Sequence, residues 1–482
     1  MEPLFITAIL LLAALLTLPM KHVRAIELIS VSAATAVFIA ALSIALGASA
    51  PAPPDASSFF AIDALGAIIA LIIGSVGLAA AVYSVFYLRA EMAKGIIGFH
   101  RVRQYFVLFN LFLMAMFFAV MVNNPILMWI AIESTTLSTV FLISFYDKPA
   151  ALEAAWKYLI INSTGLLLGF FGTLLYFTPL GETVGQGLTS WKTLTAHAAR
   201  LDPMIAKIAF VFVLIGYGTK VGFAPMHTWL PDAHSKAPAP ISALLSGVLL
   251  NIALFAVLRF KLLTDAAAGA AFTGKLLVFF GLFSIVIAAL IMLTMQNYKR
   301  LLAYSSIENM GIAALGFGVG GAGVFAAILH IIYHALVKPA LFFLAGNIFL
   351  KYSSTKISRI SGAISALPIT AGLFLAGFLA VTGTPPFGIF FTKVYVLSAS
   401  MKMHPLAGFI AIAAFALVFI GFLKQAMAMI FGEKPEEMPA GEIHPLLWAA
   451  PLVLLATVLL LSFYLPEFLS ELITQAVGKY AL

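Results

Sequence analysis

Residues 216–225 read Gly-Tyr-Gly-Thr-Lys-Val-Gly-Phe-Ala-Pro, and they interrupt an apolar run long enough to cross a membrane. A second interruption, Gly-Thr-Pro-Pro-Phe-Gly at residues 383–388, lies in another apolar run and is followed by Lys393. Irregular backbone at membrane depth survives only where protein or a water-filled cavity satisfies the freed polar groups. These two stretches therefore predict two discontinuous helices, each with a lysine at or near its break.

The composition places the chain in a membrane. Of its 482 residues 63% are hydrophobic and only 10% are charged, and the mean hydropathy is +1.09. Water-soluble domains carry about 25% charged residues, so an ordinary soluble protein is excluded. Since a helix crosses a bilayer in about 20 apolar residues, we predict an all-α polytopic membrane protein.

Apolar runs separated by polar residues predict about fourteen spans, of which the first is interpreted as a span and not as a secretory signal. They lie near residues 3–20, 25–48, 64–88, 105–122, 124–146, 151–177, 204–225, 240–260, 273–295, 301–319, 322–350, 366–400, 407–431 and 446–466. The broken spans are the seventh and the twelfth, five spans apart, as in transporters built from inverted repeats. We therefore expect a three-helix segment (1–104), two inverted five-helix repeats (105–260 and 273–431) and a C-terminal helix and tail (446–482).

The charges in the loops predict the orientation. Lysine and arginine are more frequent in loops that follow odd-numbered spans, for example Arg101 and Arg103 or Lys299 and Arg300. By the positive-inside rule, both termini of the chain then face away from the cytoplasm across the cell (inner) membrane. The net charge of +8 is spread over many loops, without the basic cluster that a nucleic acid would need.

Cysteine is absent from the sequence. This excludes thiolate-bound iron–sulfur clusters, cysteine zinc sites and disulfides within the chain. Any redox chemistry is therefore expected on other chains.

Several ionisable residues fall inside the predicted spans. A charge at mid-bilayer costs at least about 2.5 to 3.5 kcal/mol on insertion scales, so each needs a partner or a function. Burial raises the pKa of a carboxyl group and lowers that of a lysine, and a neighbouring opposite charge does the reverse. The two effects can balance, so a buried Glu–Lys pair can exchange a proton near neutral pH. The residues in question are Glu133, Lys157, Lys220, His330, His334, Lys338 and Lys393.

Each of these residues also has a structural interpretation. Glu133 and Lys220 could form a fixed buried ion pair. His330 and His334, four residues apart, suit a proton relay, but they could also be core histidines or, with a third ligand that the sequence does not offer nearby, bind a metal. Lys157 could extend to the membrane surface, and Lys338 could cap a half-helix that ends before Pro339.

Four further polar residues are less distinctive. Glu308 lies near the end of its span, where a solvated position is the more common outcome. His227 and His234, between the broken helices, are expected to line a water path, and they make only a weak zinc motif. Lys424 is a single lysine on an apolar helix for which the sequence suggests no partner.

The chain resembles a known superfamily at several motifs. They are Gly218-Thr-Lys-Val-Gly-Phe-Ala-Pro-Met-His-Thr-Trp-Leu-Pro-Asp-Ala233, Pro238-Ala-Pro-Ile-Ser-Ala243, Leu302-Ala-Tyr-Ser-Ser-Ile-Glu-Asn-Met-Gly311 and His334-Ala-Leu-Val-Lys-Pro-Ala-Leu-Phe-Phe343. With the Glu133 span, these motifs resemble, over nearly the whole chain, the antiporter-like subunits of respiratory complex I, multisubunit cation/proton antiporters and membrane-bound hydrogenases. Ser-Ile-Glu-Asn-Met-Gly and the run that ends at Asn251 look most like component F of the hydrogenase-4 and formate hydrogenlyase group.

The resemblance implies a polar axis along the membrane midplane. Glu133 and Lys220 would be the coupled pair and Lys157 their modulator, with His330 and His334 as relay and Lys393 as the terminal exchange residue. Where many complex I subunits carry Lys or His on the eighth helix, this chain has Ser246 and Asn251. Neither can hold a charge, so the resemblance implies a hydrated gap there.

The sequence therefore predicts a non-redox subunit that translocates protons, or exchanges H⁺ for Na⁺, in a multisubunit membrane oxidoreductase of the hydrogenase-4 type. Iron–sulfur clusters and a Ni–Fe centre are expected on partner subunits, which would include other antiporter-like subunits and hydrophilic redox subunits. The alternatives are a subunit of a Na⁺/H⁺ antiporter, a proton-pumping subunit of complex I, a membrane scaffold, and a carrier for an organic solute.

Overall fold

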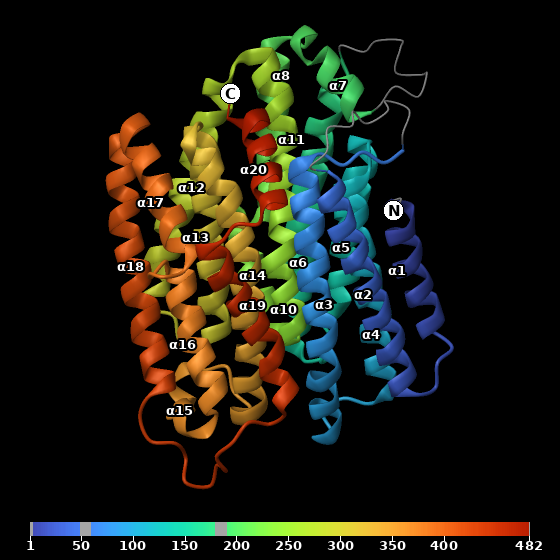
Figure 1. Cartoon of the computed structure of the whole chain (residues 1–482), viewed down its shortest axis with the longest axis vertical. Helices are drawn as coiled ribbons and strands as arrows, with labels where there is room; N and C mark the ends of the chain where they lie inside the picture. Colours follow the sequence, from blue (N-terminus) through green and yellow to red (C-terminus); the bar gives the residue numbers. More distant parts are fainter. Residues whose placement is uncertain (1–2, 49–58, 179–189, 482) are drawn as a thin grey trace.

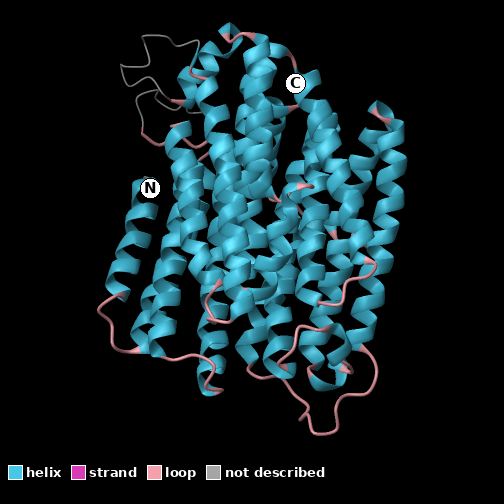
Figure 2. Cartoon of the chain, turned by 180° about the vertical axis from the view of Figure 1, so that it is seen from behind, coloured by secondary structure: helices cyan, strands magenta, loops and turns pink. Residues whose placement is uncertain are grey.

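The computed structural model describes residues 3–48, 59–178 and 190–481. Over these ranges the chain forms a bundle of long helices joined by short loops and two isolated β-bridges (Figures 1 and 2). The two chain ends both lie in the upper half of the bundle in Figure 1, and the long α18–α19 loop lies at the opposite end. The predicted all-helical class is confirmed.

The helices follow one another in chain order, with short 3₁₀ and π segments between some of them. Their bounds are α1 Pro3–Thr17, α2 Val23–Gly47, α3 Ala64–Ala93, α4 Phe99–Met121, α5 Pro125–Ile143, α6 Pro149–Leu175, α7 Trp191–His197, α8 Pro203–Val221, α9 Trp229–Lys236, α10 Ala239–Leu244, α11 Leu250–Ala268, α12 Ala270–Met292, α13 Tyr298–Val319, α14 Ala322–Tyr352, α15 Ala363–Ala366, α16 Pro368–Thr382, α17 Gly388–Met403, α18 Pro405–Ile430, α19 Pro445–Phe463 and α20 Glu467–Tyr480.

The molecule is a multi-pass membrane protein. Eleven segments among the described residues are long and apolar enough to cross a membrane, and α1 and α16 are shorter apolar helices. Large apolar side chains are exposed on outer helices, among them Leu406, Phe409 and Leu460. Such a surface would be unfavourable in water, and it suits contact with lipid acyl chains.

The first predicted break is present between α8 and α9. Gly222 ends α8 with φ 86°, and its N–H donates to the Gly218 carbonyl oxygen at 3.0 Å. A Cβ at Gly222 would lie 2.6 Å from Leu230 Cδ1, so both the conformation and the packing favour glycine there. The Ala224 N–H, freed by the break, donates to Ser284 Oγ on α12 at 3.0 Å, so neighbouring helices satisfy the opened backbone as a membrane requires.

The second predicted break is present between α16 and α17. Gly383 follows the last residue of α16 with φ 82°, and the Thr384 N–H donates to the Leu379 carbonyl oxygen at 2.9 Å. Two structurally similar glycine ends thus interrupt helices that are far apart in the sequence.

The structure differs from the predicted spans in three places. The eighth span is longer than predicted, because α10, a π-helical turn at Leu245–Leu249 and α11 run on as one rod from Ala239 to Ala268. The short helix α7 and the amphipathic helix α20 were not predicted, because neither has a long apolar run.

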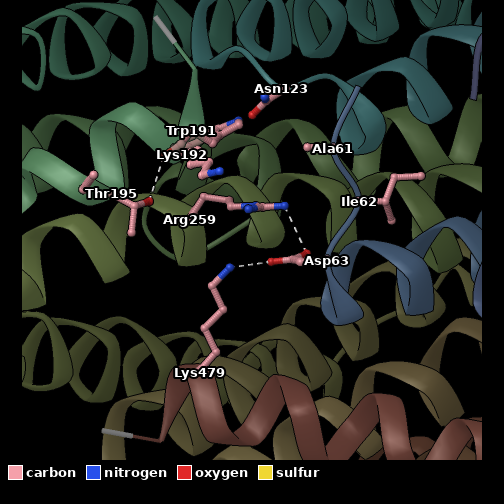
Figure 3. A pocket seen from close by; sticks show the side chains of 10 residues that line it. Ala61, Ile62, Asp63, Asn123, Trp191, Lys192, Thr195, Arg259 and Lys479 are labelled. Carbon is pink, nitrogen blue, oxygen red and sulfur yellow. Dashed lines mark hydrogen bonds and ion pairs between the residues drawn. The ribbon is translucent and has the colours of Figure 1, made fainter. Parts of the chain in front are cut away.

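An ion-pair cluster fastens the C-terminal helix α20 to the bundle (Figure 3). Asp63 caps α3 by accepting from the Gly66 N–H at 2.9 Å, and it also accepts from Arg259 of α11 at 3.0 Å and Lys479 of α20 at 2.8 Å. Burial alone would raise the pKa of the Asp63 carboxyl. The charges of Arg259 and Lys479, with the hydrogen bonds from Lys479 and the Gly66 N–H, outweigh burial and lower this pKa to about 2.

We expect Asp63→Asn to lower the thermal stability of the purified protein in detergent, by roughly 2 kcal/mol at neutral pH. The lowered pKa means that the stabilisation is complete above the ordinary value of 3.8 and is lost as the pH falls toward about 2. The difference in melting temperature between wild type and Asp63→Asn should therefore be constant above about pH 5 and should shrink at lower pH. A difference that grows on acidification would contradict this account.

Candidate functional site

Lys220 lies in the last turn of α8, next to the first break, and its side chain is buried. Its Nζ donates to Thr136 Oγ1 on α5 at 2.5 Å and to the Tyr158 hydroxyl on α6 at 3.0 Å. The carbonyl end of a helix carries partial negative charge, which favours an ammonium group at this position. Helices α5 and α6 and the carbonyl end of α8 therefore hold the Lys220 amine.

Glu133 lies one turn before Thr136 on α5 and faces the Thr136 hydroxyl group. Its carboxylate accepts from Ser163 Oγ of α6 at 2.6 Å and from Thr136 Oγ1 at 3.3 Å. The structure thus places Thr136 between Glu133 and Lys220, where its hydroxyl can accept from the amine and donate to the carboxylate. The direct ion pair considered as a structural alternative is not formed.

A second lysine and carboxylate meet at the other break. Lys393 of α17 donates to Glu308 of α13 at 2.8 Å, and only 6% and 1% of the two side chains are exposed. Lys393 also donates to the carbonyl oxygen of Thr382, the last residue of α16, at 3.1 Å. The solvated position expected for Glu308 is wrong, because α13 is enclosed by other helices along almost its whole length.

Lys338 lies in the middle of the long helix α14. Its Nζ donates to Ser305 Oγ on α13 at 2.6 Å and to the Leu302 carbonyl oxygen. Helix α14 continues through Pro339, so the half-helix end that Lys338 was suggested to cap does not exist. Lys338 instead joins α14 to α13 one turn from Glu308.

His330 and His334 lie on the same helix and are both fully buried. Nδ1 of His330 is 2.9 Å from Thr392 Oγ1, next to Lys393, whereas neither ring nitrogen of His334 has a hydrogen-bond partner. Within the described ranges, no group of three or more His, Asp or Glu side chains could hold a metal ion.

The region between the two lysine sites contains hydroxyl groups. Ser246, in the π-helical turn, lies 2.7 Å from Ser306 of α13, and Ser306 adjoins the serine that Lys338 contacts. The Asn251 amide donates to the Gly247 carbonyl oxygen of its own helix, and its Oδ1 has no partner. Uncharged groups that can donate and accept hydrogen bonds therefore lie on the eighth span, where many complex I subunits carry a lysine or histidine.

The remaining candidates lie toward the outside of the bundle or in other contacts. The Lys157 side chain is 49% exposed and pairs with Glu153 at 2.6 Å and Asp232 at 3.5 Å. His234 is fully buried and stacks on Phe342, whereas His227 is slightly exposed. Lys424 is exposed on α18.

Sequence reasoning missed the hydroxyl groups that complete both sites. A usable signal was present for two of them, because Thr136 lies three residues after Glu133 and Ser305 three residues before Glu308. A hydroxyl one helical turn from a buried charge faces the same direction as that charge. Tyr158 carries no such signal, since α6 brings it to Lys220 only in the folded bundle.

Two broken helices, each with a buried lysine opposite a glutamate on another helix, define a class of polytopic membrane protein similar to ion-translocating subunits. The family model for NADH:quinone oxidoreductase/Mrp antiporter transmembrane proteins matches residues 122–421, and the chain belongs to this family of antiporter-like membrane subunits.

Individual relatives agree with this assignment. The chain is 39% identical to the hydrogenase-4 component F homolog of Methylacidiphilum infernorum (isolate V4), over 89% of this chain and 86% of that protein. It superposes on a chain of the archaeal membrane-bound sulfane sulfur reductase with a TM-score of 0.87 and 22% identity, covering 99% of this chain and 97% of that one. For a chain of respiratory complex I from Thermus thermophilus the TM-score is 0.82 at 21% identity, with 99% of both chains covered. The two structural likenesses establish the fold.

Replacement of Glu308 should lower the stability of the protein more than replacement of Glu133. Glu308→Gln leaves Lys393 buried without a counter-charge, and breaking a buried pair in this way typically costs about 3 to 5 kcal/mol. Glu133→Gln retains hydroxyl partners at a partly exposed position, so we expect about 1 kcal/mol. Thermal unfolding of the two purified variants in the same detergent would measure the difference. Equal losses would contradict the importance of the Glu308–Lys393 pair.

Proposed function

We propose that this chain translocates protons as a subunit of a multisubunit membrane oxidoreductase of the hydrogenase-4 type. The observation that carries the proposal is the repeated arrangement of a buried lysine at a helix break and a glutamate on a neighbouring helix. Buried charges of this kind are costly, and in membrane proteins they mark ion pathways and proton relays.

The same arrangement supports fourteen crossings in two inverted repeats. The crossings would be α1 to α6, α8 with α9, α10 with α11, α12, α13, α14, α16 with α17, α18 and α19. Helix α13 is less apolar, but it is enclosed by protein, so it does not need an apolar surface. Each half (105–260 and 273–431) then carries its glutamate on its second helix and its lysine on the broken fourth helix, between a three-helix segment (1–104) and a C-terminal helix and tail (446–482).

The two halves differ in how lysine and glutamate interact, and this difference supports a switch. In the first half Thr136 separates Glu133 from Lys220, whereas in the second half Lys393 contacts Glu308 directly. Direct contact with a carboxylate favours the ammonium form of a lysine more strongly than a contact through a hydroxyl group does. Moving either pair between the two arrangements would take up or release a proton.

A route between the two sites can be traced through groups that exchange hydrogen bonds. From Lys220 it would cross the gap near Ser246 and Ser306 to Lys338, and then pass Glu308 to Lys393, with His330 and His334 as relay. His227, His234 and Asn251 would support this route, and Lys157, next to Tyr158 on α6, would modulate Lys220. Moving one charge against 100 mV costs about 2.3 kcal/mol, which coupling between buried charges can supply.

The complex would contain other antiporter-like subunits together with hydrophilic subunits that hold iron–sulfur clusters and a Ni–Fe centre. The 39% identity to a hydrogenase-4 component F homolog favours this assembly over a Na⁺/H⁺ antiporter or complex I. The loop charges favour the inner membrane with both termini on the non-cytoplasmic side. Purification through a tag on this chain, followed by mass spectrometry, would identify the assembly, and partners without redox subunits would favour the antiporter.

We expect Lys220→Ala and Lys393→Ala to abolish proton uptake coupled to turnover, while the complex still assembles. The measurement is the quenching of a pH-sensitive dye in proteoliposomes that contain the purified complex, with redox turnover followed in the same sample. Lys424→Ala provides a matched control, since this lysine lies on a span but is exposed and outside the proposed route. Undiminished uptake per turnover in both test variants would refute the proposed route and favour a scaffold.

A further inference from the structure

Glu91 is a buried carboxyl that the proposed route does not use. It lies on α3, outside both repeats, and its side chain has no solvent exposure. One carboxylate oxygen accepts from the Tyr146 hydroxyl at 2.6 Å, and the other has no hydrogen-bond partner. Glu91 lies in the last turn of α3, and Lys94, one turn further along the chain, is already exposed. This end of α3 lies at the end of the bundle opposite the chain ends (Figure 1).

Lys299, at the start of α13, is a second buried ionisable group. Only 3% of this residue is exposed, and its Nζ donates to the Ala237 carbonyl oxygen at 3.0 Å and lies 5.8 Å from the centre of the Phe349 ring. Electrostatic interaction links Lys299 with Glu91, which has Lys299 and Lys94 as its neighbouring cations. The end of α9 therefore holds a buried amine within electrostatic reach of the buried carboxyl.

His234 on α9 is a third buried polar group. Its ring stacks on Phe342 with centroids 4.9 Å apart, and Lys338 Nζ lies 5.3 Å from the centre of the same ring. Both ring nitrogens of His234 are without hydrogen-bond partners, although the residue is fully buried. The charges that act on His234 are those of Lys338 and Lys299.

A purely structural polar cluster would be expected to satisfy its buried atoms, because an unpaired buried polar group costs about 1 to 3 kcal/mol. Here one oxygen of Glu91 and both nitrogens of His234 are unpaired, in a series that leads from the surface to Lys338. These atoms offer the donor and acceptor sites that proton transfer through intervening hydroxyls or water requires.

We propose that Glu91, Lys299 and His234 form an entry branch that delivers protons from the surface near Lys94 to Lys338. The inference rests on the proposed function and adds to it a point of entry directly into the second half. In each cycle the Glu91 carboxyl would lose its proton to the neutral Lys299 amine, and the proton would then pass to the His234 imidazole and on to neutral Lys338. Glu91 then regains a proton from solvent, so that Glu91, Lys299 and His234 return to their starting forms and Lys338 holds the one proton that has moved, ready to pass it on along the proposed route.

The first test is Glu91→Gln in the complete complex, reconstituted in proteoliposomes and assayed for dye-reported proton uptake per turnover. We expect the rate to fall about tenfold or more, since loss of a proton-transfer group commonly costs 10²- to 10⁴-fold, and Glu91→Asp to retain part of it. Glu27→Gln is the matched control, because Glu27 is also buried but both of its oxygens are paired with Arg89. Uptake by Glu91→Gln equal to wild type would overturn the branch.

The same experiment separates failure of the branch from failure of the proposed function. If the wild-type complex turns over without taking up protons, the proposed function fails. If wild type takes up protons, Lys220→Ala abolishes uptake and Glu91→Gln leaves it unchanged, the branch alone fails.

A second test does not depend on turnover, and it uses the absence of cysteine from this sequence. Lys94→Cys, at an exposed position, would first establish the side from which a membrane-impermeant methanethiosulfonate reaches this end of the chain. From that side we expect Lys299→Cys to be labelled and Ala313→Cys, at a fully buried position on the same helix, to remain unlabelled. Failure to label Lys299→Cys in an assembled complex would overturn a hydrated branch.

Discussion

The free energy needed to bury a charge within a membrane is the constraint on which the rest of the structure depends. An ammonium ion at this depth is tolerated only where a carboxylate, a hydroxyl or a helix end compensates for its lost hydration. Lys220 and Lys393 have all three kinds of partner between them, including the carbonyl ends of α8 and α16. The helix breaks are thus electrostatic features as much as interruptions of the backbone, because each exposes helix-end carbonyl groups inside the protein.

The same constraint accounts for the hydroxyl groups around the charges. Thr136, Tyr158, Ser305 and Thr392 each contact a buried lysine or histidine. Hydroxyl groups carry no charge of their own, and each can both donate and accept a hydrogen bond. They stabilise an ammonium ion without fixing it as strongly as a carboxylate does.

The bundle also contains ion pairs that lie outside the proposed route and contain arginine. Asp63 holds Arg259 and Lys479 near one end of the molecule, where the chain ends lie, and keeps its charge at any physiological pH. Glu27 likewise accepts hydrogen bonds from two nitrogens of Arg89, Nε and Nη2. Arginine cannot lose its proton in a protein, so both arginine pairs fasten helices together. The interior sites of the proposed route use lysine and histidine, whose protonation can change.

The sequence by itself determined the helical class, the approximate extent of most spans and the position of both breaks. These features depend on local properties, namely the length of apolar runs and the backbone effects of glycine and proline. It also singled out Glu133, Lys220, His330, Lys338 and Lys393 as candidates, because an ionisable residue inside an apolar run is conspicuous. Only the tertiary structure decided which charges meet: Glu308 pairs with Lys393, and Thr136 separates Glu133 from Lys220. The packing of α13 against α17, and of α5 against α8 through α6, creates these contacts between residues far apart in the chain, and no local pattern encodes them.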